Sequence, residues 1–239
     1  MKIKEFKQIM CENLKEFNLE LSELQLEQFY KYMNLLIEWN KVMNLTGITD
    51  PKEIITKHFI DSLTVLEKIN KNSKVIDVGT GAGFPGIPIK IAYPDVEVVL
   101  LDSLNKRINF LNVVIEELEL KNIKTVHGRA EDFGRDKEYR EKYDIAIARA
   151  VAPLNILLEY LMPFVKTSGK CISMKGSNID EEIEKSYKAI NILGGEILSK
   201  KEFVIPNTDI KRSIVEIEKI KNTSSIYPRK AGTPTKKPL

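Results

Sequence analysis

The sequence predicts an α/β protein with a doubly wound sheet, an N-terminal helical appendage and a C-terminal antiparallel hairpin. Residues 71–220 carry the sheet, because from residue 73 onward short apolar runs alternate with amphipathic helical segments. Residues 1–70 show helical periodicity alone and form the appendage. The hairpin is indicated by two strand-like runs, 196–205 and 212–220, with no helix between them.

Three helices are expected in the appendage. The first covers residues 2–17 and carries its apolar side chains on one face. Ser22 and Gln25 form a capping box at the start of the second helix, which continues to Trp39. The pair Asp50-Pro51 begins the third. Apolar stripes at this spacing ordinarily form core, so we expect Trp39 to pack rather than to bind a ligand.

The sheet domain follows a regular order. We expect strands at 73–76, 96–101, 123–127, 143–148 and 170–174, and helices at 86–92, 104–118, 153–165 and 179–193. The hairpin turns at residues 206–209, and its antiparallel strand is expected to close the edge of the sheet. A tail at residues 221–239 completes the chain.

The tail is strongly basic. It holds five lysines and arginines and no acid, a charge of +5, whereas the whole chain of 239 residues carries only +3. Residues 1–220 are therefore left with −2. A basic tail on a slightly acidic body favours a polyanionic partner. A disordered, solvated terminus would have the same composition, and both interpretations stay open.

Several functional classes are disfavoured by composition. Cys11 and Cys171 are the only cysteines, no C-x-x-C pair occurs, and there are two histidines, so neither a disulfide framework nor a metal site is indicated. No apolar run approaches the roughly 20 residues that cross a bilayer, and the start lacks a signal-peptide core. We expect a cytoplasmic protein that contacts no membrane.

The glycine-rich run from Asp77 to Gly86 is the strongest functional signal. It joins an expected buried strand to an expected helix, so backbone N–H groups and a helix start can approach a ligand closely. Gly81-x-Gly83-x-x-Gly86 also fits a dinucleotide fingerprint. A carboxylate in front of those glycines would repel a pyrophosphate. Asp77 therefore favours S-adenosylmethionine, whose amino group and sulfonium are cationic, and the helixless hairpin is typical of class I methyltransferases with a Rossmann-like sheet.

Residues at the carboxyl ends of the strands should line the site. Asp102 follows the second strand and could accept both ribose hydroxyls, although a helix cap explains it equally well in isolation. Glu131 follows the third strand, where an acid and a backbone N–H suit the adenine edge, with a turn or cap as the alternative. Arg149 ends the fourth strand, next to the expected transfer centre.

The fourth-strand segment also narrows the chemistry. Residues 148–153 lack the Asn- or Asp-Pro-Pro-aromatic motif typical of adenine amino-group methylation. Carbon methylation of pyrimidines needs a nucleophilic cysteine, and Cys171 lies in mid-strand as an expected core residue. Guanine N7 fits what remains, since its lone pair attacks a methyl group without first losing a proton. Catalysis would then depend on positioning and on excluding water.

Motifs along nearly the whole chain resemble the RsmG (GidB) family of bacterial small-subunit rRNA methyltransferases. The joint presence of His58–Leu63, Gly83–Gly86 and the Arg229-Lys230 ending is highly specific. The other matching motifs are Trp39-Asn40, Asn44–Thr46, Asp102-Ser103, Lys106-Arg107, Gly128–Glu131, Ala148–Pro153, Lys175-Gly176, Tyr227-Pro228 and Lys237–Leu239.

The resemblance implies an S-adenosylmethionine-dependent enzyme that methylates N7 of a guanine, position 527 in the usual numbering, in the 530 loop of 16S rRNA. It implies cofactor contacts at Gly79, Phe84, Ala130, Glu131 and Arg149. We add Asp102 as the ribose acceptor and Asp77 as the group facing the methionyl amine. Arg149 is the expected catalytic residue. A methyltransferase of another RNA or a small molecule, and a noncatalytic RNA-binding module, stay as alternatives.

The expected partner is 16S rRNA within the 30S subunit or an assembly intermediate, bound by a monomer. Candidate RNA contacts are His58, Lys106, Arg107, Arg129, Arg149, Lys175, Arg229 and Lys230. The first-turn cations Lys106 and Arg107 could instead be a solvated face, and Lys175 could neutralise a strand end. His58, Asp61 and Ser62 could form a hydrolytic triad, but a helix junction or a lid suits them better.

Overall fold

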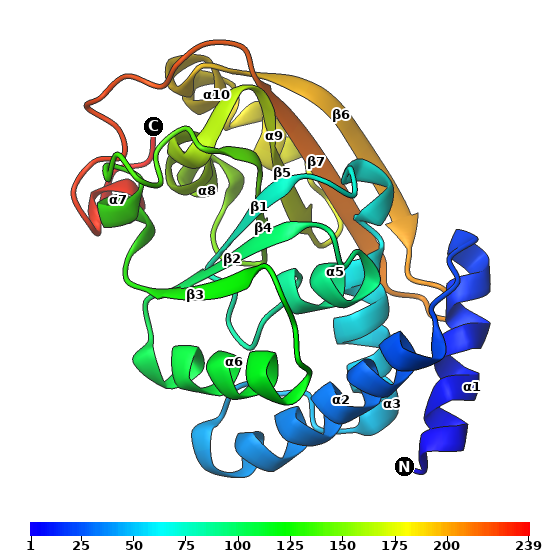
Figure 1. Cartoon of the computed structure of the whole chain (residues 1–239). Coiled ribbons are helices and arrows are strands. Elements are labelled where there is room, and N and C mark those ends of the chain that lie inside the picture. The colour runs from blue at the N-terminus through cyan, green and yellow to red at the C-terminus, as the bar shows by residue number, and fades with distance from the viewer.

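The computed structural model describes residues 1–239 and contains a seven-stranded sheet with helices on both faces (Figure 1). The strands are β1 (Lys74–Val78), β2 (Glu97–Asp102), β3 (Ile123–His127), β4 (Tyr143–Arg149), β5 (Val165–Lys175), β6 (Gly195–Val204) and β7 (Lys211–Lys219). Their spatial order is β3-β2-β1-β4-β5-β7-β6. The pairs among β1 to β5 are parallel, and β7 runs antiparallel to both β5 and β6. The predicted doubly wound sheet with a terminal hairpin is confirmed.

The place of the antiparallel strand corrects the sequence prediction. We expected it at the sheet edge, but β7 lies between β5 and β6, and β6 forms the edge. Residues 213–217 of β7 are all buried, whereas β6 exposes charged side chains such as Glu196, Lys200 and Lys201. An apolar strand gains most from two neighbours, and charges on the outer strand discourage pairing with other chains.

Successive strand residues point into two separate cores. Val75 packs with the helices of one face, and Ile76 packs with those of the other. The first face is covered by α1 (Ile3–Leu14), α2 (Glu23–Met43), α3 (Pro51–Ile54), α4 (Asp61–Leu63), α5 (Gly86–Ala92) and α6 (Asn105–Glu117). The second is covered by α7 (Ala130–Phe133), α8 (Leu154–Leu161), α9 (Asp180–Glu184) and α10 (Tyr187–Leu193). The last helix is α11 (Thr233–Lys236).

The appendage shares its core with the sheet. Phe59, in the π-helical turn between α3 and α4, stacks on Tyr32 of α2 with ring centroids 5.4 Å apart. Tyr32 in turn stacks on Phe84 of the glycine-rich run, again at 5.4 Å. The Ser22–Gln25 capping box is present as predicted. Trp39 packs against Phe110 of α6 as expected.

Some helices differ from the prediction. The helix expected at 179–193 is broken at Ser186, whose hydroxyl donates to the Glu182 carbonyl and competes with the helical pattern. The helix expected at 153–165 ends earlier, and β5 already begins at Val165. The short helix α7 was not predicted, because four residues carry no periodic signal. No helix combines the length and apolar character needed to cross a bilayer.

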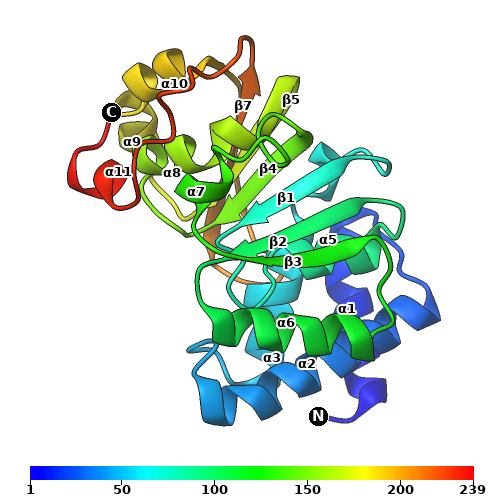
Figure 2. The same cartoon turned by 60° about the vertical axis from the view of Figure 1, so that its left-hand side comes forward.

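The C-terminal segment, residues 221–239, is docked rather than solvated along its length. Figures 1 and 2 show it, in red, running beside α7 and α8. Arg135 and Arg140 donate to five of its carbonyl groups, which gives the segment partners that composition does not reveal. The alternative of a disordered terminus is therefore wrong.

We predict that Phe59→Ala lowers the free energy of unfolding by about 3–5 kcal/mol, because it empties the junction between appendage and sheet. Urea unfolding followed by Trp39 fluorescence and by far-UV circular dichroism should give coincident transitions. Leu24→Ala, at an exposed site, should change the free energy by less than about 0.5 kcal/mol. Separate transitions for the two probes would show that the appendage has its own core.

Candidate active site

A cavity of about 790 Å³ opens at the carboxyl ends of β1, β2, β4 and β5. Its size falls within the roughly 300–1,000 Å³ of small-molecule sites. The glycine-rich run forms one wall, and the appendage and the start of β7 form the opposite one. Of the predicted site residues, it is lined by His58, Gly79, Phe84, Asp102, Arg107, Arg149 and Lys175.

The glycine-rich run is shaped by two different constraints. Gly81 has φ +63°, a left-handed conformation that favours glycine, and a Cβ there would meet no atom within 4 Å. Its backbone is therefore open to the cavity. At Gly86 a Cβ would lie 2.3 Å from Leu100 Cδ2 and 2.8 Å from Asp77 Oδ2. Only glycine lets α5 pack this closely on the sheet.

Asp77, the first residue of the run, lies beneath its glycines and does not line the cavity. Its Oδ2 accepts hydrogen bonds from the Thr80 hydroxyl (2.6 Å) and the Gly86 N–H (2.8 Å), whereas Oδ1 has no partner. Complete burial raises the pKa of Asp77 to about 7, against the lowering effect of these two hydrogen bonds. The carboxyl group thus braces the run. Its predicted contact with a methionyl amine stays a prediction.

Asp102 reaches the cavity and also supports the local backbone. Its Oδ2 accepts from Gly81 N–H (2.9 Å) and from Arg107 Nη1 (3.2 Å), and Oδ1 accepts from Leu104 N–H (2.9 Å). The carboxylate is therefore fixed against the glycine-rich run. These three bonds use both lone pairs of Oδ2 and one of Oδ1, so one lone pair of Oδ1 is left for a ribose hydroxyl. Asp102 does not cap α6, which has no side-chain cap.

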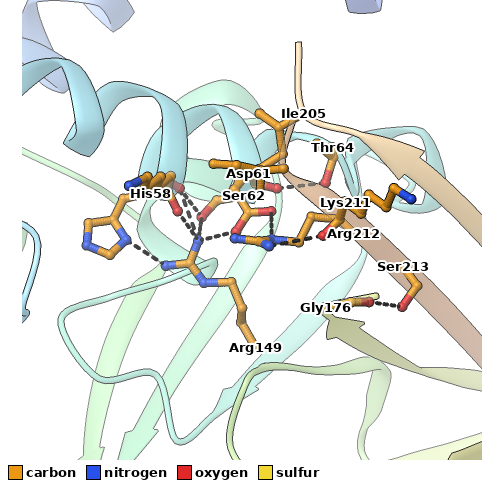
Figure 3. A network of polar contacts seen from close by, with 12 residues as sticks. His58, Asp61, Ser62, Thr64, Arg149, Gly176, Ile205, Lys211, Arg212 and Ser213 are labelled. Carbon is orange, nitrogen blue, oxygen red and sulfur yellow. Dashed lines mark hydrogen bonds and ion pairs between the residues drawn. The ribbon is translucent and has the colours of Figure 1, made fainter. Parts of the chain in front are cut away.

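Arg149 extends from the end of β4 to the appendage (Figure 3). Its Nη1 lies 3.1 Å from Asp61 Oδ2 and 3.2 Å from Ser62 Oγ, and it also donates to the carbonyls of Lys57 and His58. The guanidinium carbon lies 5.0 Å from the centre of the Phe84 ring, a cation–π distance. The sheet supplies this cation, and the appendage fixes its direction.

His58 is held as a neutral imidazole. Nδ1 lies 3.1 Å from Arg149 Nη2, which can only donate, so Nε2 carries the proton and donates to Thr46 Oγ1 at 2.9 Å. Burial, and then the charge of Arg149, lowers the pKa of His58 to about 3. The ring stacks on Phe84 with centroids 4.4 Å apart. Ser62 bonds the His58 carbonyl rather than the ring, so the hydrolytic-triad interpretation is wrong.

Arg212 of β7 is a site residue that the sequence did not reveal. Its Nε lies 3.2 Å from Asp61 Oδ1, so one buried carboxylate joins Arg149 and Arg212 (Figure 3). Asp61 is only 4% exposed. The available signal was a cation beside an apolar strand, Arg212-Ser213-Ile214, which periodicity alone does not connect to a residue 151 positions earlier.

The predicted RNA contacts fall into two groups. Besides His58 and Arg149, whose contacts are given above, four are already engaged: Lys106 with the Met43 carbonyl, Arg107 with Asp102, Lys175 with Glu182 and the Ala152 carbonyl, and Arg229 with Glu159. The three paired with carboxylates would have to exchange them to bind phosphate. Arg129 and Lys230 are exposed and make no side-chain hydrogen bond or ion pair.

Ala130 and Glu131 lie in α7, beside the cavity rather than in its wall. His127 is in register with Asp102, and Gly128 N–H donates to the Asp102 carbonyl at 3.0 Å, which brings the start of α7 near the end of β2. The side chain of Glu131 points to the C-terminal segment, where Oε1 accepts from Gly232 N–H at 3.1 Å.

Comparison with known proteins identifies close relatives. The sequence model of the family described as rRNA small subunit methyltransferase G matches residues 25–215. The ribosomal RNA small subunit methyltransferase G of Desulforamulus reducens is 56% identical over 94% of this chain and 95% of the relative. The protein of the same name from Acetivibrio thermocellus is 54% identical over 98% and 96%.

Solved structures of low identity support the fold. M. jannaschii TYW2, in complex with AdoMet, aligns with a TM-score of 0.53 and 17% identity over 67% of this chain and 77% of that one. A geranyl diphosphate methyltransferase in complex with SAM aligns with a TM-score of 0.51 and 9% identity over 66% and 84%. The predicted class I methyltransferase fold is thereby confirmed.

We predict that Asp77→Asn stabilises the chain increasingly as pH rises. The folded-state pKa of about 7 lies above the usual 3.8, so the contribution of Asp77 is favourable below about pH 4 and is lost as pH rises towards 7. The loss amounts to about 4 kcal/mol over this window. Urea unfolding at several pH values measures the free energy of unfolding of variant and wild type. The difference between the two should grow up to about pH 7 and then stay constant. A difference independent of pH would contradict the raised pKa.

Proposed function

The chain belongs to the rRNA small subunit methyltransferase G family, and from this premise we propose that it transfers a methyl group from S-adenosylmethionine to N7 of a guanine in the 530 loop of 16S rRNA. The observation that carries the proposal is the convergence of Gly81, Asp102 and Arg149 on one cavity. The first two suit the nucleoside of the cofactor. Arg149 lies on the side of the cavity from which the guanine would enter.

The residues present fit S-adenosylmethionine, which supplies an electrophilic methyl group on a sulfonium. Gly81 offers open backbone, and Asp102 offers a carboxylate lone pair suited to a ribose hydroxyl. Behind the run, the buried Oδ1 of Asp77 has no hydrogen-bond partner and can accept from a cationic group. S-adenosylmethionine has no phosphate, so its binding requires neither a phosphate-binding cation nor a helix N-terminus directed at the ligand.

The acceptor side supports a reaction without a general base. His58 is neutral, its Nδ1 is occupied by Arg149, and its pKa of about 3 keeps it from taking up a proton near neutral pH. Guanine N7 carries a lone pair and loses no proton on methylation, so the chemistry demands none. The protein contributes orientation and exclusion of water.

Arg149 is proposed to orient the guanine. Nη1 and one Nη2 donor are directed to the appendage, and Nε makes no hydrogen bond within the protein. The free N–H groups can donate to guanine O6, a common arginine contact, while N7 stays available for attack. Phe84 and His58 hold the guanidinium plane, so its direction is set before the substrate arrives.

The surroundings of the cavity suit an RNA loop. Four cations line it, each paired with a carboxylate: Lys57, Arg107, Lys175 and Arg212. The partners of Lys57 and Lys175, Glu53 and Glu182, are exposed enough to be exchanged for the phosphates of single-stranded RNA. We propose that the substrate is 16S rRNA in a 30S subunit or an assembly intermediate, that the enzyme acts as a monomer, and that it acts in the cytoplasm, where these particles are.

The decisive experiment offers tritiated S-adenosylmethionine and 30S subunits that lack the N7 methyl group. We expect one methyl group per subunit, and chemical cleavage specific for N7-methylguanine should locate it in the 530 loop. Naked 16S rRNA in a parallel reaction tests whether the particle is required. Label at another base, or incorporation into small molecules only, would contradict the proposal.

We predict that Arg149→Ala lowers kcat by about 100-fold or more, because the guanidinium donors are lost at the transfer centre. Arg149→Lys keeps the charge but not the planar donors, so it should recover only part of the activity. Single-turnover methyl transfer with saturating cofactor measures both. Lys166→Ala, which removes a cation paired with Asp144 away from the cavity, is the matched control. Full activity of Arg149→Ala with a native circular dichroism spectrum would remove Arg149 from the transfer centre.

A further inference from the structure

The C-terminal segment makes contacts that a charged tail for RNA would not need. It crosses α7 and α8 on the second face of the sheet (Figure 2). Tyr227 and Leu239 pack against the hydrophobic core there. The segment is therefore part of the fold beside α7, the helix that follows the third strand, at whose end the adenine is expected.

One set of contacts joins the segment to α7. Gly232 N–H donates to Oε1 of Glu131, a residue of α7, at 3.1 Å. Arg135, just after the helix, donates from Nε to the Pro228 carbonyl at 2.7 Å. A Cβ on Gly134 would lie 3.0 Å from Pro228 Cγ, so the proline packs directly on the end of α7. Both ends of this four-residue helix thus touch the segment.

A second set anchors the segment to α8. Arg229 binds Glu159 through three groups: its backbone N–H (2.7 Å), Nε (2.8 Å) and Nη2 (2.6 Å). Glu159 is fully buried, and Arg229 is its only cationic partner. Tyr160 Oη adds a hydrogen bond of 3.1 Å to Thr235 Oγ1. A multidentate pair around a buried carboxylate holds much more firmly than an exposed ion pair.

Arg140 links the two sets. Its Nη1 donates at 2.8 Å both to the Gly134 carbonyl at the end of α7 and to the Tyr227 carbonyl of the segment. Its Nη2 donates to the Thr223 carbonyl at 2.6 Å. The position of α7 is consequently determined by the segment on one side and by β3 on the other.

We propose that the C-terminal segment is a clasp for the adenine side of the cofactor site, and that Arg229 is a positioning residue acting through Glu159. With Arg229 anchored, Gly232 three residues later meets Glu131 and fixes α7. The inference rests on the proposed function and on adenine binding at Ala130 and Glu131. It assigns Arg229 to the cofactor rather than to RNA.

The chain offers a matched pair of variants for the test. Arg229→Ala and Lys230→Ala each remove one charge at neighbouring positions, but Lys230 is exposed and has no side-chain partner. We expect Arg229→Ala to raise the Kd for S-adenosylhomocysteine and the KM for S-adenosylmethionine roughly 5- to 20-fold, the range for residues coupled in one hydrogen-bond network. kcat at saturating cofactor should change less than about twofold in Arg229→Ala, and Lys230→Ala should leave the Kd for S-adenosylhomocysteine unchanged.

Base discrimination separates positioning from a general loss of stability. Calorimetric titration with S-adenosylhomocysteine and with S-inosylhomocysteine measures the preference for adenine. A clasp that aligns the adenine edge predicts that this preference shrinks in Arg229→Ala. Uniform weakening of both ligands would overturn the inference.

A second variant covers the case in which a buried, unpaired Glu159 prevents folding. Glu159→Met with Arg229→Met replaces the pair by apolar side chains of similar length, which usually keeps or raises stability. Its adenine preference should still shrink, because the hydrogen bonds that the Glu159 carboxylate accepts from residue 229 are absent. Native affinity and preference in this double variant would overturn the inference.

Binding to 30S subunits at several salt concentrations tests the RNA alternative. If Arg229→Ala lowered the salt slope by about 0.7 with cofactor affinity unchanged, Arg229 would be an RNA contact and the clasp would be rejected. The proposed function is tested separately by the wild type. A wild type that neither binds S-adenosylmethionine nor methylates 30S subunits would defeat that function, whereas a functional wild type and an unaffected Arg229→Ala would defeat the clasp alone.

Discussion

The buried carboxylate of Asp61 is the interaction on which the site depends. It joins three parts of the chain that are far apart in sequence: the appendage, the end of β4 through Arg149 and the start of β7 through Arg212 (Figure 3). Removing one partner from such a buried pair costs about 3–5 kcal/mol, since a charge is left without compensation. Arg149 is therefore in place only when the appendage and the hairpin are both folded onto the sheet.

Asp61 and Asp77 are both buried, but their carboxyl groups have different partners. Two guanidinium groups bond directly to Asp61. Asp77 has a hydroxyl and one backbone N–H, and burial raises its pKa to about 7. A cationic ligand near Asp77 would favour its charged form and lower its pKa.

Local patterns in the sequence were sufficient for most of the fold. The alternation of apolar runs predicted the sheet, and Ser22 with Gln25 predicted the start of α2, because both signals lie within a few residues. The position of β7 was missed, since its burial depends on which strand it pairs with. Arg212 was missed for the same reason: its partner, Asp61, is brought near only by the tertiary fold. Asp77 was found by its place before the glycines, but its depth beneath them could not be inferred from spacing.

The basic C-terminal segment is the part of the chain whose interpretation the fold changes most. The segment 221–239 holds five cations, which by composition alone favoured a polyanionic partner. In the structure Arg229 is neutralised by a buried glutamate, whereas Lys230 beside it is free. The free energy of binding RNA depends on cations that can exchange their neighbours for phosphates, and a cation that already satisfies a buried acid gains little by the exchange. A count of charges therefore overstates the electrostatic reach of a docked segment, and the contacts of each cation decide whether it serves the fold or the substrate.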